Sequence, residues 1–187
     1  MAQDFSLALT DMTSLIAGAV WIKNDSTKYV DLGQVYYGGV LFEPLDTPEF
    51  ALGIAASYGY IQSSYLNEDI ISIYDDFQPV DDFYSDALSL NFRFRWAMNE
   101  MITFTETASY LLALQDTEYY KWSTATRVKC KITDNISFFT EYSVIFHRNP
   151  LVGEVQDFLE AKRIRGESVG EMEDIDTALA AGITLEF

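Results

Sequence analysis

The chain has 187 residues, 49% of them hydrophobic, which suits one folded domain over residues 1–187, yet no stretch reaches the ~20 consecutive apolar residues of a membrane-spanning helix. The formal net charge of −17, from 29 acidic and 12 basic residues, argues against a nucleic-acid partner. The single cysteine, Cys130, excludes an internal disulfide framework and a cysteine metal cluster, and we expect no cofactor.

The N-terminal region lacks the marks of an export signal. The opening MAQDF has neither a basic nor an apolar stretch, so we expect a mature chain with Met1 retained from expression. Residues 1–11 are expected to form a periplasmic tail or a plug. Segment 12–23 is apolar on both faces and is expected to be a strand against lipid or a short helix.

Alternating apolar and polar residues, separated by turn residues, predict an all-β fold of about eight strands. A chain without a spanning helix crosses a membrane only as a closed barrel, because closure pairs every strand's backbone groups away from water. We therefore expect an antiparallel up-and-down transmembrane β-barrel. Its strands are expected at roughly residues 12–23, 29–42, 49–65, 85–97, 101–115, 118–132, 135–147 and 174–187.

The connections support this topology, because outer-membrane barrels alternate short periplasmic turns with longer outer loops. Short links fall at 44–48, 98–100 and 133–135, and the long loops 66–84 and 148–173 lie on the other side. The aromatic content of 15% is typical of barrels with aromatic belts at both membrane interfaces. Both termini are thus expected on the periplasmic side.

The two faces of the predicted strands differ in charge. In segment 85–97, for example, Leu90 and Phe92 share one face while Arg93 and Arg95 share the other. Charges must face the lumen, since Arg or Lys toward lipid at mid-membrane costs ~2–4 kcal/mol. Glu106 and Gln34 fall on the apolar face in phase, and a β-bulge at either position would correct this.

The inward charges are expected to form ion pairs, because the interior of an eight-stranded barrel is filled by side chains. We predict a lumen ion-pair network of Arg93, Arg95, Arg127, Lys129 and Lys131 with Glu141, Asp176 and Glu186, and with Glu106 if a bulge turns it inward. The alternative is a narrow polar path lined by the same residues.

The last twelve residues, DTALAAGITLEF, alternate up to the terminal Phe187. This ending resembles the closing strand of bacterial outer-membrane barrels, whose terminal aromatic residue is a signal for the insertion machinery. It predicts a location in the bacterial outer membrane, with membrane lipid and the barrel-insertion machinery as partners.

The long loops carry most of the negative charge. Asp75, Asp76, Asp81 and Asp82 in loop 66–84 are candidate ligands for a divalent cation such as Ca²⁺, which prefers oxygen atoms. Their spacing matches no EF-hand loop. The alternative is a solvated anionic surface that limits association.

His147 is the only histidine, and it shares one strand face with Ser143 and Glu141. Residues two or four apart along a strand stand ~7 and ~13 Å apart, so this row alone cannot form a hydrogen-bonded triad. We expect no enzyme. A lipid-modifying enzyme is the alternative, and lipid turnover that disappears in a His147→Ala variant would support it.

Several motifs together resemble the salt-induced outer-membrane proteins, a Gram-negative β-barrel family of unknown function. The resemblance covers about residues 36–187 and is carried by the hairpin at 36–60, the run at 90–144, Asn149-Pro150 and the ending at 174–187. It implies a barrel fold but carries over no functional residues.

We therefore expect an outer-membrane barrel with a structural or envelope stress-adaptation role. One alternative is a narrow pore for ions or small solutes. Another is a soluble β-barrel that binds an apolar ligand, in which the aromatic residues face inward and the charges outward.

Overall fold

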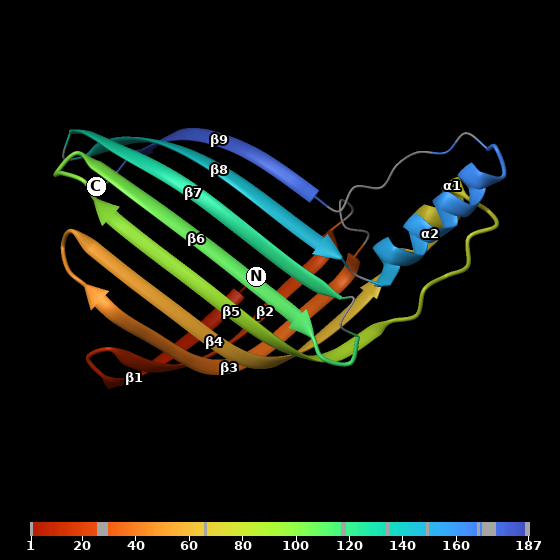
Figure 1. The fold of residues 1–187 in the computed structure, drawn as a ribbon, viewed down its shortest axis with the longest axis horizontal. Helices are drawn as coiled ribbons and strands as arrows, with labels where there is room; N and C mark the ends of the chain where they lie inside the picture. The colour runs from red at the N-terminus through yellow and green to blue at the C-terminus, as the bar shows by residue number, and fades with distance from the viewer. Residues whose placement is uncertain are drawn as a thin grey trace.

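The chain folds into one antiparallel β-sheet with two helices beyond one of its ends (Figure 1). The computed structural model describes residues 2–25, 30–65, 67–116, 119–133, 135–148, 150–167, 169 and 175–185. Nine strands are hydrogen-bonded in sequence order. The strands are β1 (Ala2–Thr10), β2 (Thr13–Asp25), β3 (Val30–Asp46), β4 (Phe50–Tyr65), β5 (Phe83–Ala97), β6 (Ile102–Ala113), β7 (Tyr120–Thr133), β8 (Ile136–Arg148) and β9 (Ile175–Leu185), and the helices are α1 (Asn67–Ile73) and α2 (Pro150–Ile164).

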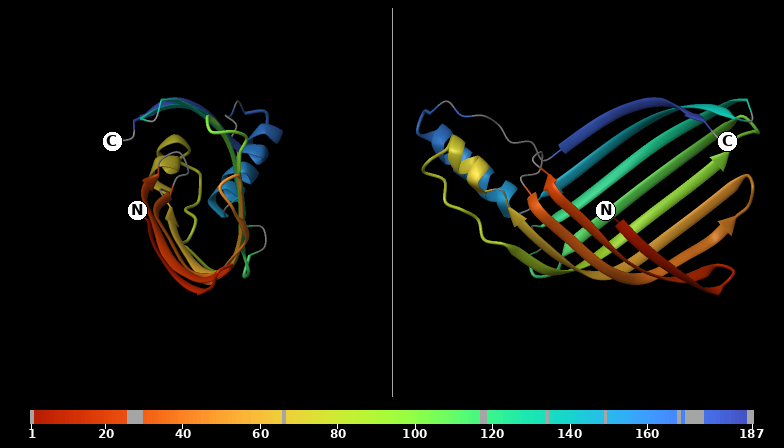
Figure 2. Two further views of the ribbon diagram at one scale, coloured as in Figure 1. Left: turned by 90° about the vertical axis from the view of Figure 1, so that its left-hand side faces the viewer. Right: turned by 180° about the vertical axis from the view of Figure 1, so that it is seen from behind.

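The described residues form nine strands rather than the predicted eight. Residues 2–10, predicted as a tail or plug, form β1, because this segment pairs along β2 from Ala2 with Val20 to Thr10 with Thr13. Segment 12–23 is accordingly a strand and not a helix. Seen end-on, the sheet curls into an incomplete ring, and β1 and β9 are not paired among the described residues (Figure 2). Neither α1 nor α2 is long and apolar enough to cross a membrane.

The two long loops are partly helical, which the sequence analysis missed. Leu151, Val155, Phe158 and Leu159 lie at the i, i+4, i+7 and i+8 positions of one face of α2. With Tyr65, Ile70 and Phe77 they enclose a hydrophobic cluster beyond the end of the sheet. We call α1, residues 74–82 and α2 the helical cap.

The register places the apolar residues of neighbouring strands on one face. Leu90 pairs with Ala56 on one side and Tyr110 on the other, and these side chains lie on the convex side. Leu90 is 52% exposed and Leu88 47%, whereas Ala87 on the other face is only 3% exposed. The predicted alternation is therefore present in β5, with the apolar residues directed outward.

The register is regular at Glu106 and Gln34, so neither position has the bulge that would have corrected its phase. Glu106 pairs in regular register with Phe94 and Thr126, so it stays on the convex face. The Thr126 hydroxyl donates to Glu106 Oε2 at 2.6 Å, and the Tyr36 hydroxyl donates to Gln34 Oε1 at 2.6 Å. Neighbouring hydroxyls thus satisfy both polar groups on the apolar face, and no change of phase is needed.

Gly39 is expected to tolerate no larger side chain. A Cβ at this position would lie 2.6 Å from Ser57 Cα and closer still to the Ala56 carbonyl oxygen, so β3 and β4 would have to separate. Gly39→Ala should destabilise the fold by ~1–3 kcal/mol. Gly38→Ala is the matched control, because its nearest atom is Ile16 O at 3.9 Å. The fraction that migrates as folded protein on an unheated denaturing gel measures both, and equal loss in the two variants would contradict the expectation.

Candidate functional site

The concave face of the sheet is lined by small side chains, many of them hydroxyl-bearing. Ser57 and Ser89 share a hydrogen bond of 2.6 Å, and Ser109 and Ser123 one of 2.7 Å. A cavity of about 530 Å³ lies against them. The interior of a small barrel is normally filled by its own side chains, but residues this small leave part of this face open. The cavity is lined by Ile16, Val20, Gly33, Gln34, Val35, Tyr37, Ala55, Ser57, Ile61, Ser63, Ser89, Asn91, Ser109, Tyr110, Leu111, Tyr119, Lys121, His147 and Arg148.

A second cavity of about 560 Å³ continues the first toward the short turns of the sheet. Both cavities are lined by Ala55, Asn91 and Ser109, so they adjoin along the concave face. The second cavity also contains opposite charges, from Glu43 and Asp46 on β3 and from Arg93 and Arg95 on β5. Together the adjoining cavities extend along most of the length of the strands, and their lining includes both polar and apolar groups.

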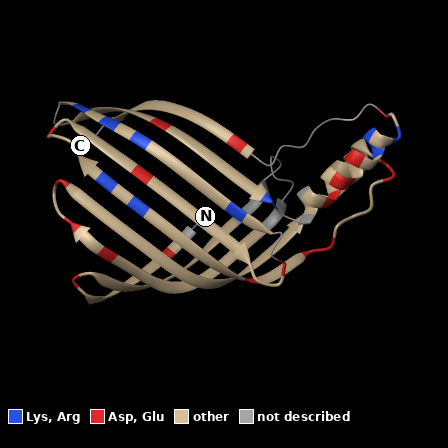
Figure 3. Cartoon of the chain, in the orientation of Figure 1, with Lys and Arg blue, Asp and Glu red and all other residues tan. Residues whose placement is uncertain are grey.

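The predicted basic residues of β5 and β7 lie on two strands that are separated by β6 (Figure 3). Arg127 Nε lies 3.5 Å from Glu141 Oε2, and the guanidinium stands 4.0 Å from the ring centroid of Phe139. Arg127 and Glu141 are direct partners in the register of β7 and β8, which brings this predicted pair together.

Other members of the predicted network have different partners. Arg95 donates from Nη2 to Thr47 O at 2.8 Å and from Nη1 to Pro48 O at 3.2 Å. Asp176 Oδ2 lies 3.7 Å from His147 Nδ1. Glu106 is excluded, because it lies on the convex face. Glu186 and Phe187 lie outside the described residues, and Lys129 and Lys131 lie on the concave face of β7.

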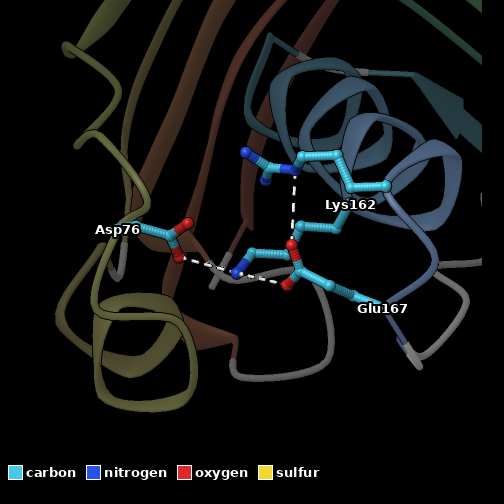
Figure 4. Close-up of polar contacts among 4 residues, drawn as sticks. Asp76, Lys162 and Glu167 are labelled. Atoms are coloured by element: carbon cyan, nitrogen blue, oxygen red, sulfur yellow. Dashed lines mark hydrogen bonds and ion pairs between the residues drawn. The ribbon is translucent and has the colours of Figure 1, made fainter.

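The acidic residues of loop 66–84 do not assemble a cation site. Among the described residues, no three His, Cys, Asp or Glu side chains are grouped closely enough to hold a metal ion. The predicted ligands Asp75, Asp81 and Asp82 are therefore not part of such a group. Asp76 Oδ1 instead accepts a hydrogen bond from Lys162 Nζ at 2.9 Å (Figure 4). The carboxylate is thus neutralised by a side chain of α2.

Lys162 joins α2 to residues 74–82 of the helical cap through its contact with Asp76. The sequence analysis did not identify this residue as a candidate. Its Nζ also donates to Glu167 Oε2 at 3.1 Å, and it stands 5.1 Å from the ring centroid of Phe158. The side chain is only 13% exposed. The signal was available in the sequence, because Lys162 lies one helical turn after Phe158 and so on the apolar face of α2.

Removing the Lys162 ammonium is expected to change the titration of the cap. Its hydrogen bond lowers the pKa of Asp76 below 3.8, and the bonds to Asp76 and Glu167 raise the pKa of Lys162 above 10.5. Because the pKa of Asp76 is lowered in the folded cap, its carboxylate stabilises the cap above pH 3.8. This stabilisation is lost as the pH falls through the pKa that Asp76 has in the folded protein. Because the pKa of Lys162 is raised in the folded cap, its ammonium group stabilises the cap below pH 10.5. This stabilisation is lost as the pH rises through the pKa that Lys162 has in the folded protein.

Lys162→Met keeps the aliphatic stem and should return the pKa of Asp76 toward its ordinary value, as measured by NMR titration of the carboxyl carbon. Arg163→Met is the control, because Arg163 is an exposed residue of the same helix turn. An Asp76 titration that is unchanged by Lys162→Met would contradict the assigned contact.

His147 lies at the end of β8 nearer the helical cap, with its side chain 9% exposed. Ser143 and Glu141 share its face further along the strand, and Glu141 pairs with Arg127. The three side chains therefore form a row and not a compact triad. Asp176 of β9 lies 3.7 Å from His147, measured from Oδ2 to Nδ1.

The described strands form an antiparallel meander with an apolar convex face and a concave face that carries hydroxyl and charged groups. The NanC porin, solved in a rhombohedral crystal form, superposes with a TM-score of 0.59 at 11% identity, covering 100% of this chain and 78% of that one. This likeness concerns the fold alone. The chain belongs to the family described as protein of unknown function, DUF481, whose model matches residues 4–159. Comparison with curated proteins gives no match.

Proposed function

We propose that this protein is an outer-membrane β-barrel whose polar interior admits small polar solutes. The observation that carries the proposal is the lining of the concave face, where Ser57, Ser89, Ser109 and Asn91 leave adjoining cavities of about 530 and 560 Å³. Hydroxyl and amide groups of this kind exchange hydrogen bonds with water and with polar solutes. The likeness of the fold to a porin supports the same proposal.

The proposed location is the outer membrane of a Gram-negative bacterium. Its support is the convex face, where Phe5 is 71% exposed, Leu179 80% and Ile183 67%. Apolar surface of this extent is costly in water, and lipid is the partner that removes the cost. In a soluble barrel with an apolar interior the faces would be inverted. Folding in detergent, with a heat-dependent shift on a denaturing gel, distinguishes the two and also tests closure of the sheet.

Conductance in planar bilayers tests the proposed solute path. We expect steady conductance from the folded protein. Ser89→Phe should reduce it several-fold, because the ring would fill the space against which Ser57 and Ser89 pair. Leu88→Phe is the control, since this neighbouring residue is 47% exposed on the convex face. Absence of conductance from a protein that folds in the bilayer would overturn the proposal.

A structural role in envelope stress adaptation is the second candidate. It rests on the Arg127–Glu141 ion pair, which is a contact of the kind that fills a closed lumen, and on the resemblance to salt-induced outer-membrane proteins. In that case the wild type would not conduct, and Arg127→Gln with Glu141→Gln would open a path. A deletion strain that grows poorly at raised salt would support the stress-adaptation part.

We further propose that the protein is not an enzyme. His147, Ser143 and Glu141 are spaced along one strand, which supports a role in lining the interior. The lipid composition of membranes holding the wild type and a His147→Ala variant should be identical. Lipid turnover by the wild type alone would establish the enzyme alternative.

A further inference from the structure

We propose that Glu43 and Asp46 on β3, with Arg93 and Arg95 on β5, form a binding site for a small zwitterionic solute. The site lies on the proposed solute path and so deepens the proposed function by naming a class of solute. These residues line the cavity of about 560 Å³ at the end of the concave face nearer the short turns. The two acidic residues were not among the candidates that the sequence suggested.

A break in register gives β3 its two inward carboxylates. Residues three apart on a regular strand point to opposite faces, yet Glu43 and Asp46 both line the concave cavity. The pairing of β3 with β4 shifts between Phe42 and Leu45, so one extra residue of β3 lies opposite Gly53. Bulges re-aim side chains and are frequent beside functional sites. The irregularity therefore places both acidic groups in the cavity.

Strand β4 separates the acidic and basic groups with a floor of small residues. Asp46 and Arg95 are both register partners of Ala51, on its two sides, and Arg93 is the partner of Gly53. Glu43 lies over the same glycine, since a Cβ on Gly53 would contact Glu43 Cγ at 3.7 Å and Oε1 at 3.9 Å. The backbones of β3 and β5 stand ~9–10 Å apart, which is two strand spacings.

The opposite charges face each other without forming an ion pair. Among the described residues, neither Glu43 nor Asp46 is within ion-pair distance of Arg93 or Arg95. Arg95 donates to the neutral carbonyl groups of Thr47 and Pro48, which fix the position of its guanidinium without neutralising its charge. Glu43, Asp46 and Arg93 are exposed on the concave face, so water can solvate their charges. The space between them suits a solute that carries both signs.

A zwitterion matches this arrangement at both ends. Its carboxylate can accept paired hydrogen bonds from a guanidinium, the geometry that arginine prefers, while its ammonium group lies against Glu43 or Asp46. An anion or a cation alone would satisfy only one side. A cavity of about 560 Å³ is within the usual range of small-molecule sites, and Asn91, Thr107 and Ser109 supply further polar contacts along it.

Binding of γ-aminobutyrate, butyrate and butylammonium to the detergent-folded protein tests the site by calorimetry or ligand-observed NMR. These probes share a chain length and differ in charge. We expect the zwitterion to bind about tenfold more tightly than either singly charged probe. Equal binding of the three probes, or no binding of the zwitterion, would overturn the proposal.

Variants separate the two halves of the site. Glu43→Gln with Asp46→Asn should weaken γ-aminobutyrate to the level of butyrate, and Arg93→Gln should weaken it to the level of butylammonium. Glu100→Gln in the exposed turn before β6 and Arg163→Gln in the helical cap are matched controls that should change nothing. Weakening of all probes alike by the site variants would contradict the assignment.

A double variant that exchanges the acidic and basic residues of the site distinguishes loss of binding from misfolding. Glu43→Arg with Arg93→Glu should still prefer the zwitterion, because both signs remain on the floor of Ala51 and Gly53. Loss of the preference in this folded variant would count against the site. Because binding is read without conductance, a protein that binds γ-aminobutyrate but does not conduct would refute the solute path and leave the binding site standing.

Discussion

Leu90→Arg is expected to lower the free energy of unfolding in lipid by ~2–4 kcal/mol. Leu90 lies at the middle of β5, is 52% exposed, and shares the convex face with its register partners Ala56 and Tyr110. If this face meets lipid, an arginine there must take its charge into hydrocarbon or distort the sheet to reach the interface. Urea unfolding of the protein in lipid vesicles, followed by the fluorescence of its 3 tryptophans, measures the loss.

Asn91→Arg is the matched control for Leu90→Arg. Asn91 is the next residue of β5 and lines both concave cavities, so an arginine there projects into polar space. We expect a change within about 0.5 kcal/mol of the wild type. The opposite ranking of the two variants would mean that the apolar face is the interior, and it would favour a soluble barrel that binds an apolar ligand.

The sequence predicted the strands whose alternation is strongest. Segments 49–65 and 85–97 correspond closely to Phe50–Tyr65 and Phe83–Ala97, because a period of two reports directly on a sheet with unlike faces. Strand β1 was missed, since its pairing with β2 is what makes it a strand and not a tail. The helix α2 was missed although its apolar residues recur at helical spacing, because the residues that cover them, Tyr65 and Phe77, come from another part of the chain.

The sequence could predict contacts of the candidate site only where two residues meet simply because they share a face on adjacent strands. Arg127 and Glu141 share a face on adjacent strands, so their pairing could be anticipated. Glu43 and Asp46 share a face only because the register shifts between Phe42 and Leu45. Pro44, which cannot donate to the sheet, lies within this bulge, but the sequence analysis assigned it to the turn at 44–48. Periodicity alone therefore could not place the two carboxylates together.

The same limit explains the charges that found other partners. Arg95 reaches the carbonyl oxygens of Thr47 and Pro48, and Lys162 reaches Asp76 from a different loop. Both contacts depend on how far one segment extends beyond its neighbour, which is a property of register and loop packing. Counting charges on a face therefore identified which side chains point inward but not which ones meet.

Leu151→Ala is expected to unfold the helical cap while the sheet stays intact. Leu151 is 0% exposed, and it packs in the cluster that Tyr65, Ile70 and Phe77 form with α2. Truncating a buried leucine costs ~2–5 kcal/mol, through lost contacts and the cavity left behind. The cap is a short two-helix unit with one small core, so a loss of that size exceeds what its other contacts can offset.

Limited proteolysis of the folded protein measures the effect of Leu151→Ala, since an unfolded cap is cut between β8 and β9 while the sheet remains protected. Ile164→Ala is the control, because Ile164 lies in the same helix, is 80% exposed, and should lose less than about 0.5 kcal/mol. If the cap of Leu151→Ala resists protease as well as that of Ile164→Ala, the cluster does not hold the cap together. If the sheet also loses its heat-dependent gel shift, the cap and the sheet form one cooperative unit.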